Sequence, residues 1–172
     1  ALFDSTHGAA VLNDCKYGVS NSGSSIKLTL LKGATNPDPY ADKGVHRFKY
    51  AYYIWDGAFS NSNIVHEAGE INNPVYIREG IAKEQSFFSV DDPAIVIETV
   101  KLAEDNSGDI IIRLYESMQG TRQAKLSTCY KIKQAWLCSM LEEKEKELHV
   151  ENSSIHLNFK AFEIITLRLS CE

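Results

Sequence analysis

Apolar and polar residues alternate with a period of two along almost the whole chain, and the apolar positions are rich in β-branched and aromatic side chains. Residues 26–31 show the pattern most clearly. Such alternation is typical of strands that bury one face. Because it leaves little room for helices, the expected fold class is all-β, built as an antiparallel β-sandwich.

In the first half, residues 9–14 lead through a turn rich in Gly, Ser and Asn into residues 26–31, which predicts that these two runs pair as a hairpin. Another strand is expected at residues 46–54 and a short one at residues 75–77. Residues 55–71 predict either an amphipathic helix or an irregular crossover. The apolar face of that helix would hold Ile64, Val65, Ala68 and Ile71.

In the second half, the turn signal at residues 91–93 (Asp-Asp-Pro) marks an expected boundary between two β units. Residues 94–102 and 109–116 flank a polar turn and should pair as an antiparallel hairpin. Further strands that continue and close the sheet are expected at residues 123–132, 134–140, 154–159 and 162–169. The charged run at residues 142–147 is shorter than the roughly 12 residues of a stable isolated helix, so we expect a solvated turn there.

Charge limits the classes of partner. The 172 residues carry a formal net charge of -5, and the sequence has no dense cluster of Lys and Arg. This argues against nucleic acid and against an anionic membrane surface, because cationic side chains must neutralise the phosphates of both. A neutral ligand such as a sugar fits better. No apolar run approaches the roughly 20 residues that span a bilayer, so no membrane segment is expected.

The four cysteines, at positions 15, 129, 138 and 171, include no pair with the two-residue spacing of a zinc or redox motif. They are too sparse for a disulfide-stapled secreted scaffold, so reduced thiols and a cytoplasmic location are expected. The five histidines are scattered at positions 7, 46, 66, 149 and 156. No two of them have the spacing that places imidazoles on one metal, so no metal site is expected in this chain.

Acidic pairs occur at Asp38 with Asp42 and at Asp91 with Asp92. Paired carboxylates could serve glycoside hydrolysis only if they faced each other across the bond to be cleaved. Both pairs lie in stretches with turn residues, where Asp side chains cap the backbone. Turn formation is therefore the simpler interpretation, and no catalytic residue is assigned.

Residues 12–18 place an amide, a carboxylate, an ammonium and a phenol in succession at a strand end. Such groups could form hydrogen bonds to sugar hydroxyls, while Tyr17, Tyr40 or Trp55 could offer a flat apolar face to the sugar ring. The alternative is a polar loop end that packs on a neighbouring domain, which we favour over direct ligand contact.

Taken together, a series of ordered motifs resembles the C-terminal β region of the glycoside hydrolase family 38 α-mannosidases, in particular the bacterial and cytosolic branch. The motifs cover nearly the full chain. They are residues 12–18 (LNDCKYG), 28–32 (LTLLK), 37–51 (PDPYADKGVHRFKYA), 70–74 (EINNP), 86–90 (SFFSV), 100–105 (VKLAED), 112–116 (IRLYE) and 162–169 (FEIITLRL).

The resemblance implies a parent enzyme that hydrolyses terminal α-linked mannose with retention. It implies a zinc site in an N-terminal β/α barrel that is not part of this sequence, and the barrel's His-x-Asp motif has no counterpart here. The substrate would be a mannose-terminated oligosaccharide. The β region would pack on the catalytic domain and lend side chains to the pocket rim. Candidates for that rim are Asp14, Lys16, Tyr17, Asp38, Asp42 and His46.

The same resemblance divides the chain into residues 1–90, the end of a large β-sandwich domain, and residues 91–172, a small closing β-sandwich. The first part would then be an incomplete sheet with an open edge, so self-association or coverage by a partner chain is expected. Three functions stay open at this point: a non-catalytic segment of an α-mannosidase, a free-standing carbohydrate-binding module, and a purely structural β domain. The first is favoured.

Overall fold

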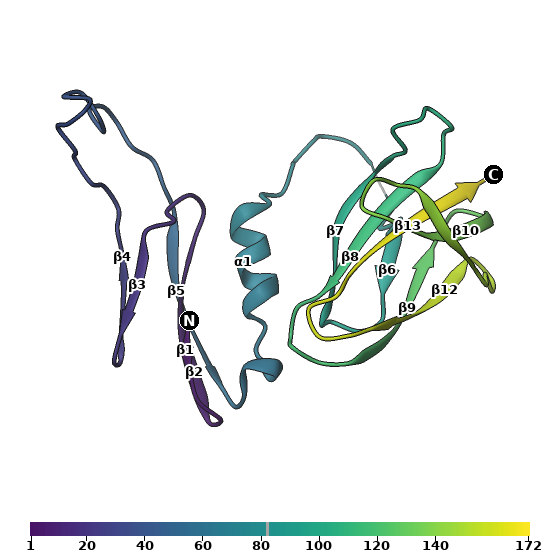
Figure 1. The fold of residues 1–172 in the computed structure, drawn as a ribbon, viewed down its shortest axis with the longest axis horizontal. Helices are drawn as coiled ribbons and strands as arrows, with labels where there is room; N and C mark the ends of the chain where they lie inside the picture. Colours follow the sequence, from purple (N-terminus) through teal and green to yellow (C-terminus); the bar gives the residue numbers. More distant parts are fainter. Residues whose placement is uncertain (82) are drawn as a thin grey trace. The chain divides into compact units, whose positions relative to one another are not determined.

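The computed structural model describes residues 1–81 and 83–172, which form two compact units, Ala1–Glu79 and Gly80–Glu172. Most of the regular structure is antiparallel strand (Figure 1), so the all-β prediction is confirmed. Strand β6 (Phe88–Val90) pairs with β9 (Arg122–Thr128) and so belongs to the second unit. The boundary between the two units in the sequence, after Glu79, therefore precedes the turn at residues 91–93.

The first unit contains a three-stranded sheet in the order β1 (Leu2–Phe3), β2 (His7–Asn13), β5 (Tyr50–Asp56). The predicted pairing of residues 9–14 with 26–31 is wrong. Instead, β3 (Val19–Ser22) and β4 (Ser25–Leu28) form a hairpin of their own. The chain reverses within this hairpin at Gly23, whose φ of 55° is accessible to glycine without strain, so residues 25–28 pair with residues 19–22 and not with β2.

Helix α1 (Ile64–Asn72) follows the short 3-10 turn η1 (Phe59–Asn61) and packs on β2. Its predicted apolar face is confirmed. Ile64 is buried, and the other members of that face pack against the same cluster, which also contains Ala10, Leu12 and Trp55. The strand expected at residues 75–77 is not formed, and its three apolar side chains are exposed.

The second unit is a sandwich of a five-stranded and a three-stranded sheet. The larger sheet has the order β11 (Lys144–Leu148), β10 (Ile132–Cys138), β13 (Ile164–Cys171), β8 (Ile110–Glu116), β7 (Ile95–Leu102), and the smaller one β12 (Ser154–Phe159), β9, β6. The β7–β8 hairpin is confirmed, with a register shift between Ile97 and Thr99. β9 and β12 do not continue that sheet as expected but form the opposing one.

Both sheets contribute to one core, which includes Ile112, Leu114 and Leu167 from the larger sheet and Leu126 and Phe159 from the smaller one. Each of these side chains is at most 1% exposed. Burial of a side chain of this size is worth about 1.5–3 kcal/mol relative to its exposure. This core holds the sandwich together and fixes the loops at its two ends.

The run at residues 142–147 is not a solvated turn as predicted. Residues Lys144–Leu148 form β11, an edge strand that pairs with β10. Its alternating charges suit an edge, because charged side chains discourage pairing with other chains. Glu142 precedes the strand and is only 8% exposed.

Candidate functional site

Two polar side chains fix the loop that follows β2, and one of them ties it to the residue before β5. Asp14 Oδ1 accepts a hydrogen bond of 3.0 Å from the backbone N–H of Lys49. Asn13 Oδ1 accepts one of 2.5 Å from the N–H of Lys16, which closes the loop on itself. The hydrogen bond from Lys49 and a further one from the Cys15 thiol hold the pKa of Asp14 below its ordinary value.

Lys16 ties the same loop to the neighbouring one. Its Nζ lies 4.7 Å from the centre of the Phe48 ring, a cation–π distance. The structure thus brings the loop at residues 14–18 against the chain that leads out of the loop at residues 37–46. The two groups of rim candidates predicted from the sequence share one region of the first unit.

In the loop at residues 37–46, the Asp42 side chain stabilises the backbone. Its Oδ2 accepts backbone N–H groups from Gly33 at 2.8 Å and Lys32 at 3.2 Å, and these hydrogen bonds lower its pKa. His46 Nε2 lies 2.9 Å from the Asp42 carbonyl oxygen. Asp38 Oδ1 accepts the N–H of Tyr40 at 2.8 Å, as expected for an aspartate that caps a turn.

Two tyrosines remain available on these loops. Tyr17 is 92% exposed, and Tyr40 is 70% exposed with Lys43 Nζ 4.4 Å from its ring centre. Trp55, considered above as a third flat surface, is only 8% exposed and belongs to the core under α1. The carboxylates of the loops are occupied by backbone groups, so the aromatic rings and the Lys16 ammonium are what the region offers to a partner.

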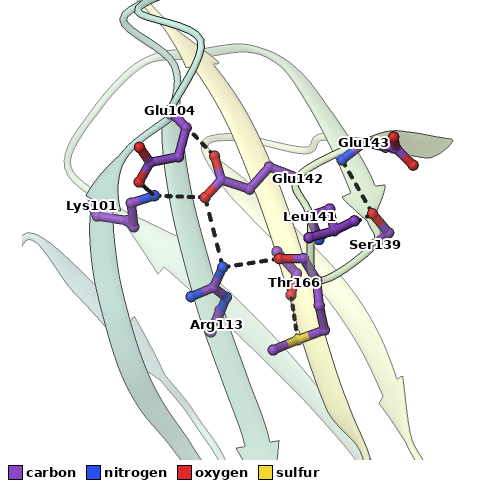
Figure 2. A network of polar contacts seen from close by, with 9 residues as sticks. Lys101, Glu104, Arg113, Ser139, Leu141, Glu142, Glu143 and Thr166 are labelled. Carbon is purple, nitrogen blue, oxygen red and sulfur yellow. Dashed lines mark hydrogen bonds and ion pairs between the residues drawn. The ribbon is translucent and has the colours of Figure 1, made fainter.

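A second polar cluster, not predicted from the sequence, lies on the five-stranded sheet (Figure 2). Glu142 Oε1 accepts a hydrogen bond of 2.6 Å from Lys101 Nζ, and its Oε2 accepts the backbone N–H of Glu104 at 2.9 Å. Arg113 Nη2 lies 3.7 Å from the same carboxylate and donates to the Met140 carbonyl at 3.2 Å. These contacts, led by the hydrogen bond from Lys101, lower the pKa of Glu142.

Arg168 on β13 forms a neighbouring cluster beneath the β7–β8 turn. Its Nε donates to Asp109 at 2.7 Å, and its Nη2 donates to Asp105 at 2.7 Å and to the Ser107 hydroxyl at 2.8 Å. A hollow of about 490 Å³ lies between this turn and the β10–β11 turn, with Glu142 and Arg168 in its lining. Glu142 pairs with Lys101, and Arg168 pairs with Asp105 and Asp109, so the arrangement holds the two turns on the sheet.

Sequence reasoning missed this arrangement because the partners lie far apart in the chain. The acidic run around Glu142 has the composition of a solvated surface, and nothing local indicates that Lys101 and Arg113 face it. The one available signal was the turn at residues 104–108, rich in polar residues, between two well-predicted strands.

Metal ligands are not gathered in the part of the chain that the structure describes: it contains no group of three or more His, Cys, Asp or Glu side chains able to hold an ion. The zinc implied by the resemblance therefore finds no set of donors among these residues. All four cysteines are free thiols, exposed at Cys15 and Cys129 and buried at Cys138. Over the described residues, no helix has the length and apolar character needed to cross a membrane.

Comparison with protein families gives two matches. Residues 94–167 match the glycosyl hydrolases family 38 C-terminal beta sandwich domain, and residues 1–40 match the glycosyl hydrolases family 38 C-terminal domain. The chain belongs to the C-terminal region of glycoside hydrolase family 38. The match at residues 94–167 falls within the sandwich of the second unit.

Individual relatives of this family 38 region are α-mannosidases. Alpha-mannosidase 2C1 of Mus musculus is 34% identical over 176 residues, which cover 98% of this chain and 17% of the relative. Alpha-mannosidase 2C1 of Homo sapiens is 35% identical (94% and 16% covered), and alpha-mannosidase G of Dictyostelium discoideum is 34% identical (94% and 16% covered). The chain therefore spans about one sixth of the length of these relatives.

Proposed function

We propose that this chain is a non-catalytic C-terminal β segment of an α-mannosidase that removes terminal α-linked mannose from oligosaccharides with retention. The alignment along almost the whole chain with relatives named as α-mannosidases carries the proposal. The catalytic acids and the zinc site belong, in this proposal, to the N-terminal barrel of the parent. A cytoplasmic location is part of the same proposal, supported by the free thiols.

The proposal also divides the chain into two domains of the parent enzyme. Residues 1–90 complete a large β-sandwich, and residues 91–172 form the small closing one. In support, the two family matches lie on either side of residue 90. β6 differs from this division, because it precedes residue 91 and pairs with β9 of the closing sandwich.

The first unit has a specific role in the proposal: it packs on the catalytic domain and places the loops at residues 14–18 and 37–46 at the rim of the substrate pocket. Asp14 and Asp42 hold the two loops in shape through backbone hydrogen bonds. Tyr17 then offers its exposed ring to the apolar face of a mannose unit, and Lys16 offers an ammonium to its hydroxyls.

The rim is tested in the parent enzyme with Tyr17→Ala and the matched control Tyr76→Ala, which removes an equally exposed tyrosine outside both loops. We expect kcat/KM for a mannoside to fall about tenfold for Tyr17→Ala, equivalent to about 1.4 kcal/mol, and to stay unchanged for the control. Equal activity of both variants, with intact folding, would support a purely structural role instead.

The alternative of a free-standing carbohydrate-binding module is tested with the 172-residue chain by itself. Titration calorimetry with methyl α-mannoside should give no saturable binding below millimolar concentrations, because the two loops offer a rim and not a complete pocket. Tight binding would favour the module. Mannosidase turnover by the 172-residue chain would overturn the proposed function altogether.

A further inference from the structure

The three-stranded sheet of the second unit has a polar outer face. Ile155, Leu157 and Phe159 of β12 are buried in the core, so the residues that alternate with them point away from it. The same alternation holds in β9 and β6. The outward side chains, called the polar face below, are those of Ser89 on β6, of Gln123, Lys125 and Ser127 on β9, and of Ser154, His156 and Asn158 on β12.

Cross-strand pairing places the side chains of the polar face in rows. Ser127 lies opposite both Ser89 and Ser154, and its hydroxyl oxygen is 3.1 Å from that of Ser154. Side chains on one face recur every second residue, so successive rows are roughly 7 Å apart. The two rows after the serines are Lys125 with His156 and Gln123 with Asn158.

An aromatic ring borders the row of serines on its other side. Phe87 precedes β6 and extends its pairing, because its carbonyl oxygen accepts the Cys129 N–H at 3.3 Å. Phe87 is 54% exposed, and its ring centre lies 6.0 Å from that of Tyr130 with 17° between the planes. The Tyr130 ring also packs 5.7 Å from that of Phe88, which supports the pair from below. From Phe87 to the last row the face extends about 20 Å, more than the width of one sugar ring.

Strand stability does not explain the residues of the polar face. Exposed strand positions favour β-branched and aromatic side chains, and none of the polar-face positions carries one. The hydroxyls of serine and the amides of Asn158 and Gln123 are neutral groups that both donate and accept hydrogen bonds. Sugar hydroxyls have the same double capacity.

The same composition limits the ligand. Nucleic acid needs several cations to neutralise its phosphates, whereas Lys125 alone carries a full positive charge within the polar face. The centre of a protein interface is rich in apolar and aromatic side chains, whereas those of the polar face are all polar. A neutral molecule with many hydroxyls and an apolar ring face suits both the polar rows and the Phe87 ring.

We propose that the polar face and the Phe87 ring form a glycan-binding site, which binds the oligosaccharide chain of a mannose-containing substrate. Phe87 receives the apolar face of one sugar unit, and the hydroxyls and amides of the rows bind its neighbours. The site belongs to the second unit, whereas the rim loops belong to the first. The inference rests on the proposed function for the kind of sugar, since the relatives are named as α-mannosidases.

Nuclear magnetic resonance of the isotope-labelled 172-residue chain tests where a sugar binds. An α-linked mannotriose should shift the amide signals of residues 87–89, 123–129 and 154–158 in a saturable manner at millimolar concentrations, as expected for an open surface. The signals of β7 and β8 in the opposite sheet are the internal reference and should stay in place. Absent shifts, or shifts spread evenly over both sheets, would overturn the proposal.

Two variants of the parent enzyme, at opposite ends of the site, test its use during catalysis. Phe87→Ala and Asn158→Ala should each lower the ratio of kcat/KM for a mannose oligosaccharide to kcat/KM for p-nitrophenyl α-mannoside by about threefold to tenfold. The loss should lie in KM, because the site binds the oligosaccharide chain and does not touch the bond that is cleaved. Phe162→Ala, which removes a ring that is 60% exposed outside the polar face, is the matched control and should leave the ratio unchanged.

The failure of this inference differs from the failure of the proposed function. A parent that hydrolyses both substrates with the same ratio in all variants would overturn the glycan-binding site and leave the proposed function intact. Saturable shifts at the polar face, together with a parent that hydrolyses no mannoside, would overturn the proposed function and leave the glycan-binding site intact.

Discussion

Gly8 lies directly opposite Trp55 in the register of β2 and β5, and the indole of Trp55 occupies the space that a side chain at position 8 would fill. A Cβ atom added to Gly8 would lie 2.0 Å from Cζ2 of that indole. Trp55 is held in place from other sides by Phe59, at a ring distance of 6.2 Å, and by Tyr53, at 5.9 Å. The close approach of backbone to ring therefore requires glycine here.

Gly8→Ala should destabilise the first unit by about 1–3 kcal/mol, because the indole cannot move without displacing its aromatic neighbours. Urea unfolding followed by tryptophan fluorescence measures this. A Trp136→Phe background leaves Trp55 as the reporter, since the chain contains two tryptophans.

Gly69→Ala is the matched control. Gly69 lies inside α1, and a Cβ atom there would meet nothing within 4 Å. Alanine should therefore stabilise the helix by about 0.5–1 kcal/mol relative to glycine. If both substitutions changed the free energy of unfolding in the same direction, the packing described for Trp55 would be contradicted.

The Arg168 cluster predicts a contrast between buried and exposed ion pairs. Arg168→Met removes three hydrogen bonds and leaves Asp109 without its main partner, so we expect a loss of about 2–3 kcal/mol in the free energy of unfolding. Lys131→Met removes an equally short contact of 2.6 Å to Glu172. Because both of those groups are exposed, the control should lose no more than about 0.5 kcal/mol. Equal losses in the two variants would show that the cluster does not clamp the turn.

The parts of the fold that depend on local signals could be predicted. Helix α1 was one of the two alternatives predicted for residues 55–71, and its apolar face was identified because four apolar positions with helical spacing precede Asn73 and Pro74. The β7–β8 hairpin was predicted because two alternating runs flank a short polar turn. The β7–β8 pair joins neighbouring strands in the sequence, and the spacing within α1 identifies its apolar face without identifying β2 as the strand on which it packs.

Pairings between distant segments could not be predicted. β2 pairs with β5, although the β3–β4 hairpin lies between them in the sequence. The alternation of residues in β2 is compatible with β4 or β5 as its partner. Glu142 is buried by a long-range ion pair with Lys101 that composition does not reveal. For the candidate rim, the structure shows only that the loops at residues 14–18 and 37–46 lie in the first unit, and their place at a substrate pocket stays a prediction. Turn chemistry indicated that Asp42 binds backbone groups, whereas no local signal indicated that Asp14 accepts the N–H of Lys49.

Asp14 also controls the reactivity of its neighbour. The side-chain hydrogen bond to Asp14, followed by burial and by the negative charge of Asp14, raises the pKa of the Cys15 thiol. Asp14→Asn removes the charge and keeps an oxygen for the Lys49 N–H, so the thiolate fraction of Cys15 should increase. We expect labelling of Cys15 by a disulfide reagent at pH 8 to accelerate about two- to fivefold.

Exposed Cys129 in the same molecule is the reference for this labelling experiment, with the two thiols separated by peptide mapping. Asp4→Asn is the control variant, because the Asp4 side chain accepts hydrogen bonds from Thr6 and His7 in its own turn. Acceleration of Cys15 by both variants would point to general loosening of the first unit.

Glu116 is a buried carboxylate that joins two loops of the sandwich. It is 1% exposed, and its oxygens accept backbone N–H groups from Met118 at 2.8 Å and Phe162 at 2.9 Å. Burial by itself would raise the pKa of Glu116. The hydrogen bonds from Phe162 and Met118, with further ones from Gly120 and Gln119, outweigh burial and lower the pKa of Glu116 below its ordinary value.

Because the folded-state pKa of Glu116 lies below the unfolded one, its ionisation contributes stability that is complete above the unfolded pKa and is lost as the pH falls through the folded pKa. Glu116→Gln should therefore cost about 1.5–3 kcal/mol between pH 6 and 8, the value of hydrogen bonds to a charged group. The difference from the unmodified chain should shrink below about pH 4.5, as urea unfolding across that range would show. A difference that stays constant down to pH 3, with both proteins still folded, would mean that the carboxylate charge does not hold these loops.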